Sequence, residues 1–184
     1  MPSFQPILDR AVQRKGGSER LQALLPVFVT ADQLRDHCDA FYLAWMAKCI
    51  FRSGFVWRII EQKWPGFETV FHGFDVNALI VLDDEEWEDF VYDDRIVRHG
   101  QKIAAVRRNA WFVHETSIQY GNFGEFLAQW PEDDLVGLFL HLKKHGSRLG
   151  GNTGQYFLQS VGKDSFALTG DVVACLRGTG VELA

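Results

Sequence analysis

The sequence predicts an all-α protein of 184 residues. Apolar residues recur at helical spacing in several segments, and capping residues or glycines divide the chain at short intervals. β-branched residues are scattered, and no segment alternates apolar and polar residues over the length of a strand. The length suits one domain, or two small lobes that share a core.

The first third of the chain predicts four helices. Residues 6–14 are amphipathic, and a second helix begins at Ser18 after two glycines. A capping box that starts at Thr30 predicts a short third helix. Residues 39–53 are apolar on nearly all sides, which predicts a buried central helix.

The middle of the chain predicts a series of shorter helices followed by one long helix. Gly54 interrupts the chain, and the helix that Phe55 opens is expected to stop at Pro65. Further helical segments are expected at residues 67–71, 75–82, 83–92, 103–118, 122–129 and 132–145.

The composition is that of a globular protein, with 47% hydrophobic and 23% charged residues. No apolar run is long enough to span a membrane, and the first residues lack the order of a signal peptide. The three cysteines are widely spaced, which indicates reduced thiols in the cytoplasm and no metal-ligand pair. The net charge of −5 argues against a broadly basic nucleic-acid-binding surface, although bases cluster at residues 95–108 and 143–148.

A glycine-rich turn at residues 146–151 separates two helical segments. Three glycines permit a tight turn, and the helix that Asn152 or Thr153 caps exposes free backbone N–H groups at its N-terminus. Such an N-terminus binds phosphate, but the same residues also suit a simple helix–helix turn with a glycine C-cap. The candidate donors are Ser147, Arg148, Gly150, Gly151, Asn152 and Thr153.

Asp171 stands twenty positions after Gly151 and precedes the apolar segment 172–176. Aspartate is a favoured N-cap, so one interpretation is purely structural. The other is a carboxylate that stabilises an oxocarbenium-like sugar and activates water. A cap holds a carboxylate in place, so the two roles are compatible.

The layout of helix, glycine-rich hairpin, helix, loop and aspartate resembles the helix-hairpin-helix DNA glycosylases. Within that superfamily the chain is similar to the DNA-3-methyladenine glycosylase I family in three stretches. They are residues 53–57 with 64–75, residues 94–110 (DRIVRHGQKIAAVRRNA) and residues 144–175. The resemblance implies a fold of two helical lobes around a cleft.

The resemblance also implies hydrolysis of the N-glycosidic bond of an alkylated adenine after base flipping. Trp57 matches the tryptophan that stacks on the base, and Trp45 and Cys49 are assigned to the base pocket. Gly54 and Phe55 match the DNA wedge, and the hairpin matches the phosphate-binding turn. Arg98, His99 and Lys102 are further candidates for contacts with the DNA backbone, and Asp171 is the candidate catalytic residue.

Two departures from the family pattern are expected to matter. Only Cys175 matches the family's zinc clip, with Asp171 in place of a histidine, so no metal or other cofactor is expected. Cys49 stands where the family has its pocket glutamate. No lysine occupies the position used by glycosylases that also cut the strand, which predicts a monofunctional enzyme.

The domain prediction is one glycosylase-like domain over residues 1–184. Residues 1–50 would form helices of one lobe, residues 51–165 a helical lobe with the hairpin at 146–152, and residues 166–184 a catalytic loop and helix returning to the first lobe. The expected partner is double-stranded DNA with alkylated bases, bound by a cytoplasmic monomer. The alternatives are a non-catalytic helix-hairpin-helix DNA-binding module and a helical protein-interaction domain.

Overall fold

A computed structural model describes residues 3–178, and within them the predicted all-α fold is confirmed. The secondary structure there consists of helices with no β-strand. In chain order they are α1 (Gln5–Lys15), α2 (Ser18–Gln22), α3 (Ala31–Arg35), α4 (Asp39–Arg52), α5 (Trp57–Val70), the 3₁₀ turn η1 (His72–Phe74), α6 (Val76–Ile80), α7 (Asp84–Asp89), α8 (Gly100–Tyr120), α9 (Phe123–Gln129), α10 (Leu135–His145), α11 (Asn152–Ser160) and α12 (Gly170–Gly178). None of these helices is long and apolar enough to cross a lipid bilayer.

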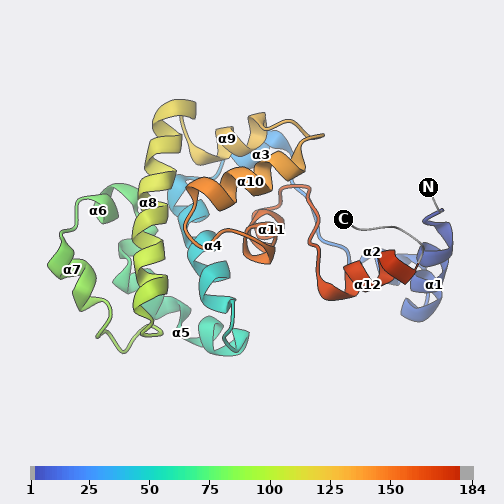
Figure 1. The fold of residues 1–184 in the computed structure, drawn as a ribbon, viewed down its shortest axis with the longest axis horizontal. Helices are drawn as coiled ribbons and strands as arrows, with labels where there is room; N and C mark the ends of the chain where they lie inside the picture. The colour runs from blue at the N-terminus through green and yellow to red at the C-terminus, as the bar shows by residue number, and fades with distance from the viewer. Residues whose placement is uncertain (1–2, 179–184) are drawn as a thin grey trace.

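The main body is organised around α4 and α8, as Figure 1 shows. Helix α4 is buried on most of its surface and packs against α8, α11, α5 and η1. The buried apolar side chains form one cluster that extends from Leu34 to Val161. The predicted boundary at residue 50 falls within the range of this cluster, and the division of the chain into lobes stays a prediction.

Side-chain caps fix several of the helix starts that the sequence predicts. Thr30 forms a capping box with Gln33 at the start of α3. Asp75 caps α6, Asp83 forms a second capping box at α7, and Asn122 caps α9. Each side chain satisfies backbone N–H groups that the first helical turn leaves without partners.

Some predicted helix boundaries are wrong. Helix α5 continues through Pro65, because Phe67 and Val70 beyond it are buried and tertiary packing outweighs the missing N–H donor. Gly66 lies against the backbone carbonyl of Arg95, which would be 2.3 Å from a Cβ atom added at Gly66. Helix α10 begins at Leu135, later than predicted, because Asp134 provides its cap.

Two predicted caps near the hairpin and the chain end also differ. The residue before α11 is Gly151, with φ of 58° and no side-chain cap, and Asn152 and Thr153 belong to the first turn. Before α12, the hydroxyl of Thr169 accepts from the N–H of Val172. Asp171 therefore lies inside the first turn of α12 and does not supply that bond.

Helices α1, α2 and α12 bury none of their residues. In Figure 1 they lie together at one end of the molecule, apart from the main body. The predicted return of residues 166–184 toward the first helices stays a prediction, since residues 179–184 lie outside the described part of the chain.

Candidate active site

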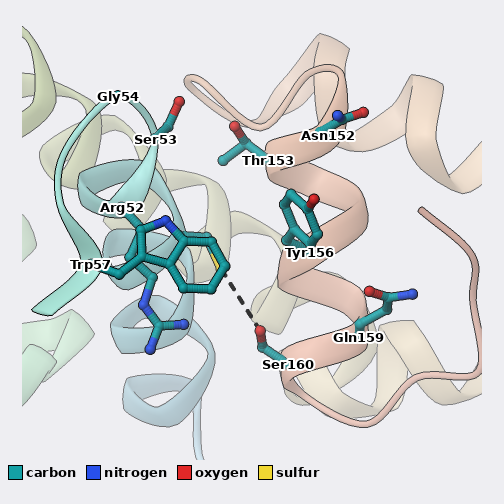
Figure 2. A pocket seen from close by; sticks show the side chains of 10 residues that line it. Arg52, Ser53, Gly54, Trp57, Asn152, Thr153, Tyr156, Gln159 and Ser160 are labelled. Atoms are coloured by element: carbon teal, nitrogen blue, oxygen red, sulfur yellow. Dashed lines mark hydrogen bonds between the residues drawn. The ribbon is translucent and has the colours of Figure 1, made fainter. Parts of the chain in front are cut away.

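A cavity of about 440 Å³ lies between the end of α4, the loop that follows it, and α11. Figure 2 shows Arg52, Trp57 and the loop on one wall, with Thr153, Tyr156 and Ser160 of α11 on the other. The lining residues are Cys49, Arg52, Ser53, Gly54, Trp57, Asn152, Thr153, Tyr156, Gln159 and Ser160. The fold thus brings Cys49, Gly54 and Trp57 to the same cavity as the residues that follow the glycine hairpin.

Trp57 provides an open aromatic surface in this cavity. It is the first residue of α5 and is 55% exposed, unlike most of the large aromatic side chains in the core. The ring of Tyr156 meets it edge-on, with 6.4 Å between ring centroids. An exposed indole in a hollow with polar groups opposite is suited to stacking against a planar base.

Cys49 lies deeper in the cavity as a neutral thiol. Its side chain is buried, and its sulfur atom is 3.9 Å from the hydroxyl oxygen of Ser160 on α11. Burial raises the pKa of the Cys49 thiol to about 11. The position that the resemblance aligns with a pocket glutamate therefore carries no charge at neutral pH.

Arg52 places a guanidinium group beside Trp57. Its central carbon is 5.1 Å from the centroid of the Trp57 ring and 5.8 Å from that of Trp45. Glu61 accepts hydrogen bonds from Arg52 and also pairs with Lys48 at 2.9 Å. Partial burial raises the pKa of Glu61, but the hydrogen bonds from Arg52 and Lys48 outweigh it and keep that pKa below its usual value.

The hairpin at residues 146–151 is held in place by α8. The side-chain amide of Asn109, fully buried, accepts from the Ser147 N–H at 2.7 Å and donates to the Ser147 carbonyl at 3.0 Å. Arg108 donates to the Ser147 hydroxyl at 3.0 Å. Arg148 bonds to Gln101, also on α8. The hairpin is therefore preorganised before any ligand arrives.

Gly154 lets the hairpin turn back tightly onto α11. A Cβ atom there would lie 2.2 Å from the carbonyl oxygen of Leu149. Gly151, Asn152 and Arg148 remain exposed at the same end of α11, where free backbone N–H groups and the helix dipole favour a phosphate. The structure thus keeps the predicted phosphate-binding turn open to solvent.

Lys102 does not face solvent, which corrects its predicted role as a DNA-backbone contact. Its side chain is 4% exposed, and its ammonium group donates to the carbonyls of Phe51 and Ser53. It also lies 4.4 Å from the centroid of the Phe55 ring. Lys102 therefore fixes the loop between α4 and α5, whose wedge candidates Gly54 and Phe55 stay exposed.

Arg98 and His99 precede α8, near the same loop. Arg98 is exposed, and the ring of His99 meets that of Phe55 edge-on at 6.0 Å. Both stay candidates for contact with the DNA backbone. Trp45 lines a neighbouring hollow with Lys48 and Trp64, so it lies behind Arg52 and outside the first cavity.

Asp171 is not part of the cavity, and its predicted position opposite Trp57 is wrong. Its side chain is exposed on α12, which lies apart from the main body in Figure 1. The preceding linker is tied to the main body where Gln155 accepts from the N–H of Leu168 at 2.8 Å. Beyond that point the chain leads away from α11, so the structure gives Asp171 no contact with a base bound at Trp57.

The zinc clip of the resembling family does not fit this chain. Cys175 and Asp171 are both exposed on α12. Within residues 3–178, no three histidine, cysteine or acidic side chains come together as a metal site.

The sequence interpretation missed several residues of the cavity. Tyr156, Gln159 and Ser160 follow Thr153 at intervals of three and four residues, so they share one face of α11. That spacing is visible in the sequence once the helix after the hairpin is assigned. Asn109 gave no comparable signal, because its partner Ser147 lies 38 residues away in the sequence. Arg52 gave none either, because a basic residue in the last turn of a helix is a common feature of helix ends.

The sequence profile of the methyladenine glycosylase family matches residues 35–136, which is more than half of the chain. The chain belongs to the methyladenine glycosylase family. The match includes Cys49, Arg52, Trp57 and Asn109, and it ends before the hairpin. A search of curated proteins found no significant match.

Solved structures support the fold of this methyladenine glycosylase family member. The structure described as the basis of 3-methyladenine recognition by 3-methyladenine DNA glycosylase I from Staphylococcus aureus has 21% identity and a TM-score of 0.60. It matches over 71% of this chain and 80% of that chain. Another 3-methyladenine DNA glycosylase I has 22% identity, a TM-score of 0.58, and coverage of 68% and 80%. A variant of that enzyme class in complex with 3-methyladenine has 20% identity, a TM-score of 0.57, and coverage of 78% and 83%.

Proposed function

We propose that this protein is a DNA-repair glycosylase that releases 3-methyladenine from alkylated double-stranded DNA by hydrolysis of the N-glycosidic bond. Membership of the methyladenine glycosylase family and the exposed Trp57 at the mouth of a base-sized cavity carry the proposal. The flipped base would stack on Trp57, and the backbone phosphates would lie against the hairpin before α11.

The proposed chemistry needs little acid catalysis for this substrate. 3-Methyladenine in DNA carries a positive charge, so the base departs as a neutral molecule when its bond to the sugar breaks. The protein contributes the flipped geometry and the aromatic platform. Water then adds to the sugar carbon and gives up a proton to solvent.

The deciding experiment measures release of 3-methyladenine from methylated duplex DNA by the wild-type protein and by Trp57→Ala. We expect release by the wild type and a loss of about tenfold or more in the variant, because base stacking contributes about 1–3 kcal/mol per base. Trp111→Ala is the matched control, since this tryptophan is also exposed but lies on α8 outside the cavity. No release by the wild type would refute the proposal.

Asp171→Asn tests the sequence-based prediction for the catalytic residue. Its side chain is exposed and outside the cavity, so we expect release within about twofold of wild type, as for a surface substitution. A loss of more than about a hundredfold would restore the predicted role of Asp171 in general-base catalysis.

A non-catalytic DNA-binding module is the second candidate. Its support is the neutral Cys49 at the position of the family's glutamate, together with the position of Asp171. Salt-sensitive binding to an abasic-site duplex without base release would favour it.

The monomeric state and the cytoplasmic location remain parts of the proposal. Light scattering after size-exclusion chromatography tests the monomeric state.

A further inference from the structure

Arg52 is the feature of the cavity that the proposed release of 3-methyladenine leaves unexplained. It is the last residue of α4, it lines the cavity, and its guanidinium group lies over the Trp57 ring. A base stacked on Trp57 would therefore lie within a few ångströms of a permanent positive charge.

The charges that line the cavity do not cancel. Lys48 and Arg52 both pair with the carboxylate of Glu61, and of these three groups only Arg52 lines the cavity. None of the described residues that line the cavity is acidic, and burial keeps Cys49 protonated. The remaining polar groups are neutral donors and acceptors, among them the hydroxyls of Thr153, Tyr156 and Ser160 in Figure 2.

This electrostatic environment affects two classes of damaged purine in opposite ways. A cationic alkylated purine is repelled by the guanidinium group, and the cavity lining offers it no carboxylate of its own. An uncharged purine that is not protonated as its bond to the sugar breaks departs as an anion, and a nearby fixed cation stabilises the negative charge that develops on it. The cavity is therefore better suited to a base that is uncharged while it is attached to DNA than a site with a glutamate at position 49 would be.

We propose that this protein also releases uncharged oxopurines such as hypoxanthine, with Arg52 stabilising the departing base. The inference rests on the proposed glycosylase function and extends its substrate class. The bond between the sugar C1′ and purine N9 breaks, and its electron pair leaves with the base. Water forms the new bond to C1′, and the proton that it loses ends on the released purine, while Arg52 stays protonated throughout.

The test compares single-turnover release of hypoxanthine from a duplex that contains one deoxyinosine with release of 3-methyladenine from methylated duplex DNA. The reported quantity is the ratio of the two rates, because a general loss of folding or DNA binding affects both. We expect Arg52→Gln to lower the hypoxanthine to 3-methyladenine ratio by about tenfold or more, and Arg52→Lys to restore part of it.

Two further variants sharpen the test. Cys49→Glu places a carboxylate one helical turn before Arg52, on the same face of α4, and is expected to lower the same ratio by favouring the cationic base. Arg58→Gln removes an exposed guanidinium group from α5 outside the cavity and is the control, with an unchanged ratio expected.

The outcomes separate this inference from the proposed function. Release of 3-methyladenine without hypoxanthine would overturn the inference and leave the proposed function intact. Release of hypoxanthine with a ratio that Arg52→Gln does not change would overturn the role of Arg52. Release of hypoxanthine alone, lost in Arg52→Gln, would support the inference while refuting the proposed substrate, and release of neither base would overturn both.

Discussion

Cys49 and Trp57 show how far single residues can be interpreted from the sequence. The family motif at residues 53–57 and the position of Cys49 on the preceding helix predict a common pocket, and the structure brings them together. Asp171 was placed by counting residues from the hairpin. The number of residues between the hairpin and Asp171 does not determine where the linker between α11 and α12 leads. The linker is held to the main body by the hydrogen bond from the Leu168 N–H to Gln155. Arg52 was missed because its role depends on contact with Trp57 and Glu61 in space.

The reactivity of Cys49 tests whether the cavity lacks a negative charge. Only the thiolate reacts with iodoacetamide, and burial raises the pKa of Cys49 to about 11, so the group is almost entirely protonated at neutral pH. We expect alkylation at least about a hundredfold slower than at the exposed Cys38 and Cys175, with the rate rising with pH up to about 11. Peptide-resolved mass spectrometry measures all three cysteines in one sample. Equal rates near neutral pH would contradict a protonated, buried thiol.

At the scale of elements, helix starts were predictable where a side chain caps the first turn, as at Thr30, Asp83 and Asn122. The end predicted at Pro65 failed because residues beyond it are buried, and the sequence alone does not reveal that packing. Helix α8 was predicted from its periodicity, but its contacts with the wedge loop and the hairpin were not. Lys102 holds the wedge loop and Asn109 holds the hairpin.

Asn109→Ala tests the support that α8 gives to the hairpin. The variant loses two hydrogen bonds and leaves partly buried backbone groups of Ser147 without these partners, which costs up to about 1–3 kcal/mol. We expect a lower free energy of unfolding in urea and weaker binding to an abasic-site duplex. Gln119→Ala, at an exposed position on the same helix, is the control. Unchanged DNA binding in Asn109→Ala would show that the hairpin keeps its shape without this clamp.

Lys102 predicts a specific dependence of stability on pH. Burial lowers its pKa to about 8 in the folded protein, from the usual value of 10.5 that applies to the unfolded chain. Between these values the unfolded state holds more protons, so the contribution of Lys102 to the free energy of unfolding increases as pH rises.

Urea unfolding of the wild type and of Lys102→Met, at about pH 7.5 and about pH 9.5, measures this contribution. The wild type should gain stability relative to the variant across that interval. Parallel changes in the two proteins would mean that Lys102 keeps an ordinary pKa when folded.

At the scale of the whole molecule, the all-α class and the family were both predictable, because they depend on periodicity and on motifs of adjacent residues. The division into lobes stays a prediction, and the buried apolar side chains form one cluster from Leu34 to Val161. The end helices α1, α2 and α12 contribute nothing to the buried surface. Val29 marks the edge of the main body, because its N–H donates to the carbonyl of Gly162 at 2.9 Å.

A chain trimmed to residues 29–168 should therefore keep the stability of the main body. It retains the buried core, the cavity and the hairpin, and we expect the thermal midpoint to change by less than about 4 °C. Differential scanning calorimetry of the full chain and the trimmed chain measures this difference. A large fall in the midpoint would show that the end helices stabilise the main body through contacts beyond its buried core.

The bonds from Lys102 and Asn109 make α8 a spacer of fixed length between two parts of the site. The two residues are separated by two helical turns, or about 10 Å along the axis. An inserted or deleted residue between them would rotate one relative to the other by about 100° and detach either the wedge loop or the hairpin. We therefore expect related proteins to carry no insertion or deletion between Lys102 and Asn109. The turn at Gly121, to which neither the wedge loop nor the hairpin is bonded, should tolerate such changes.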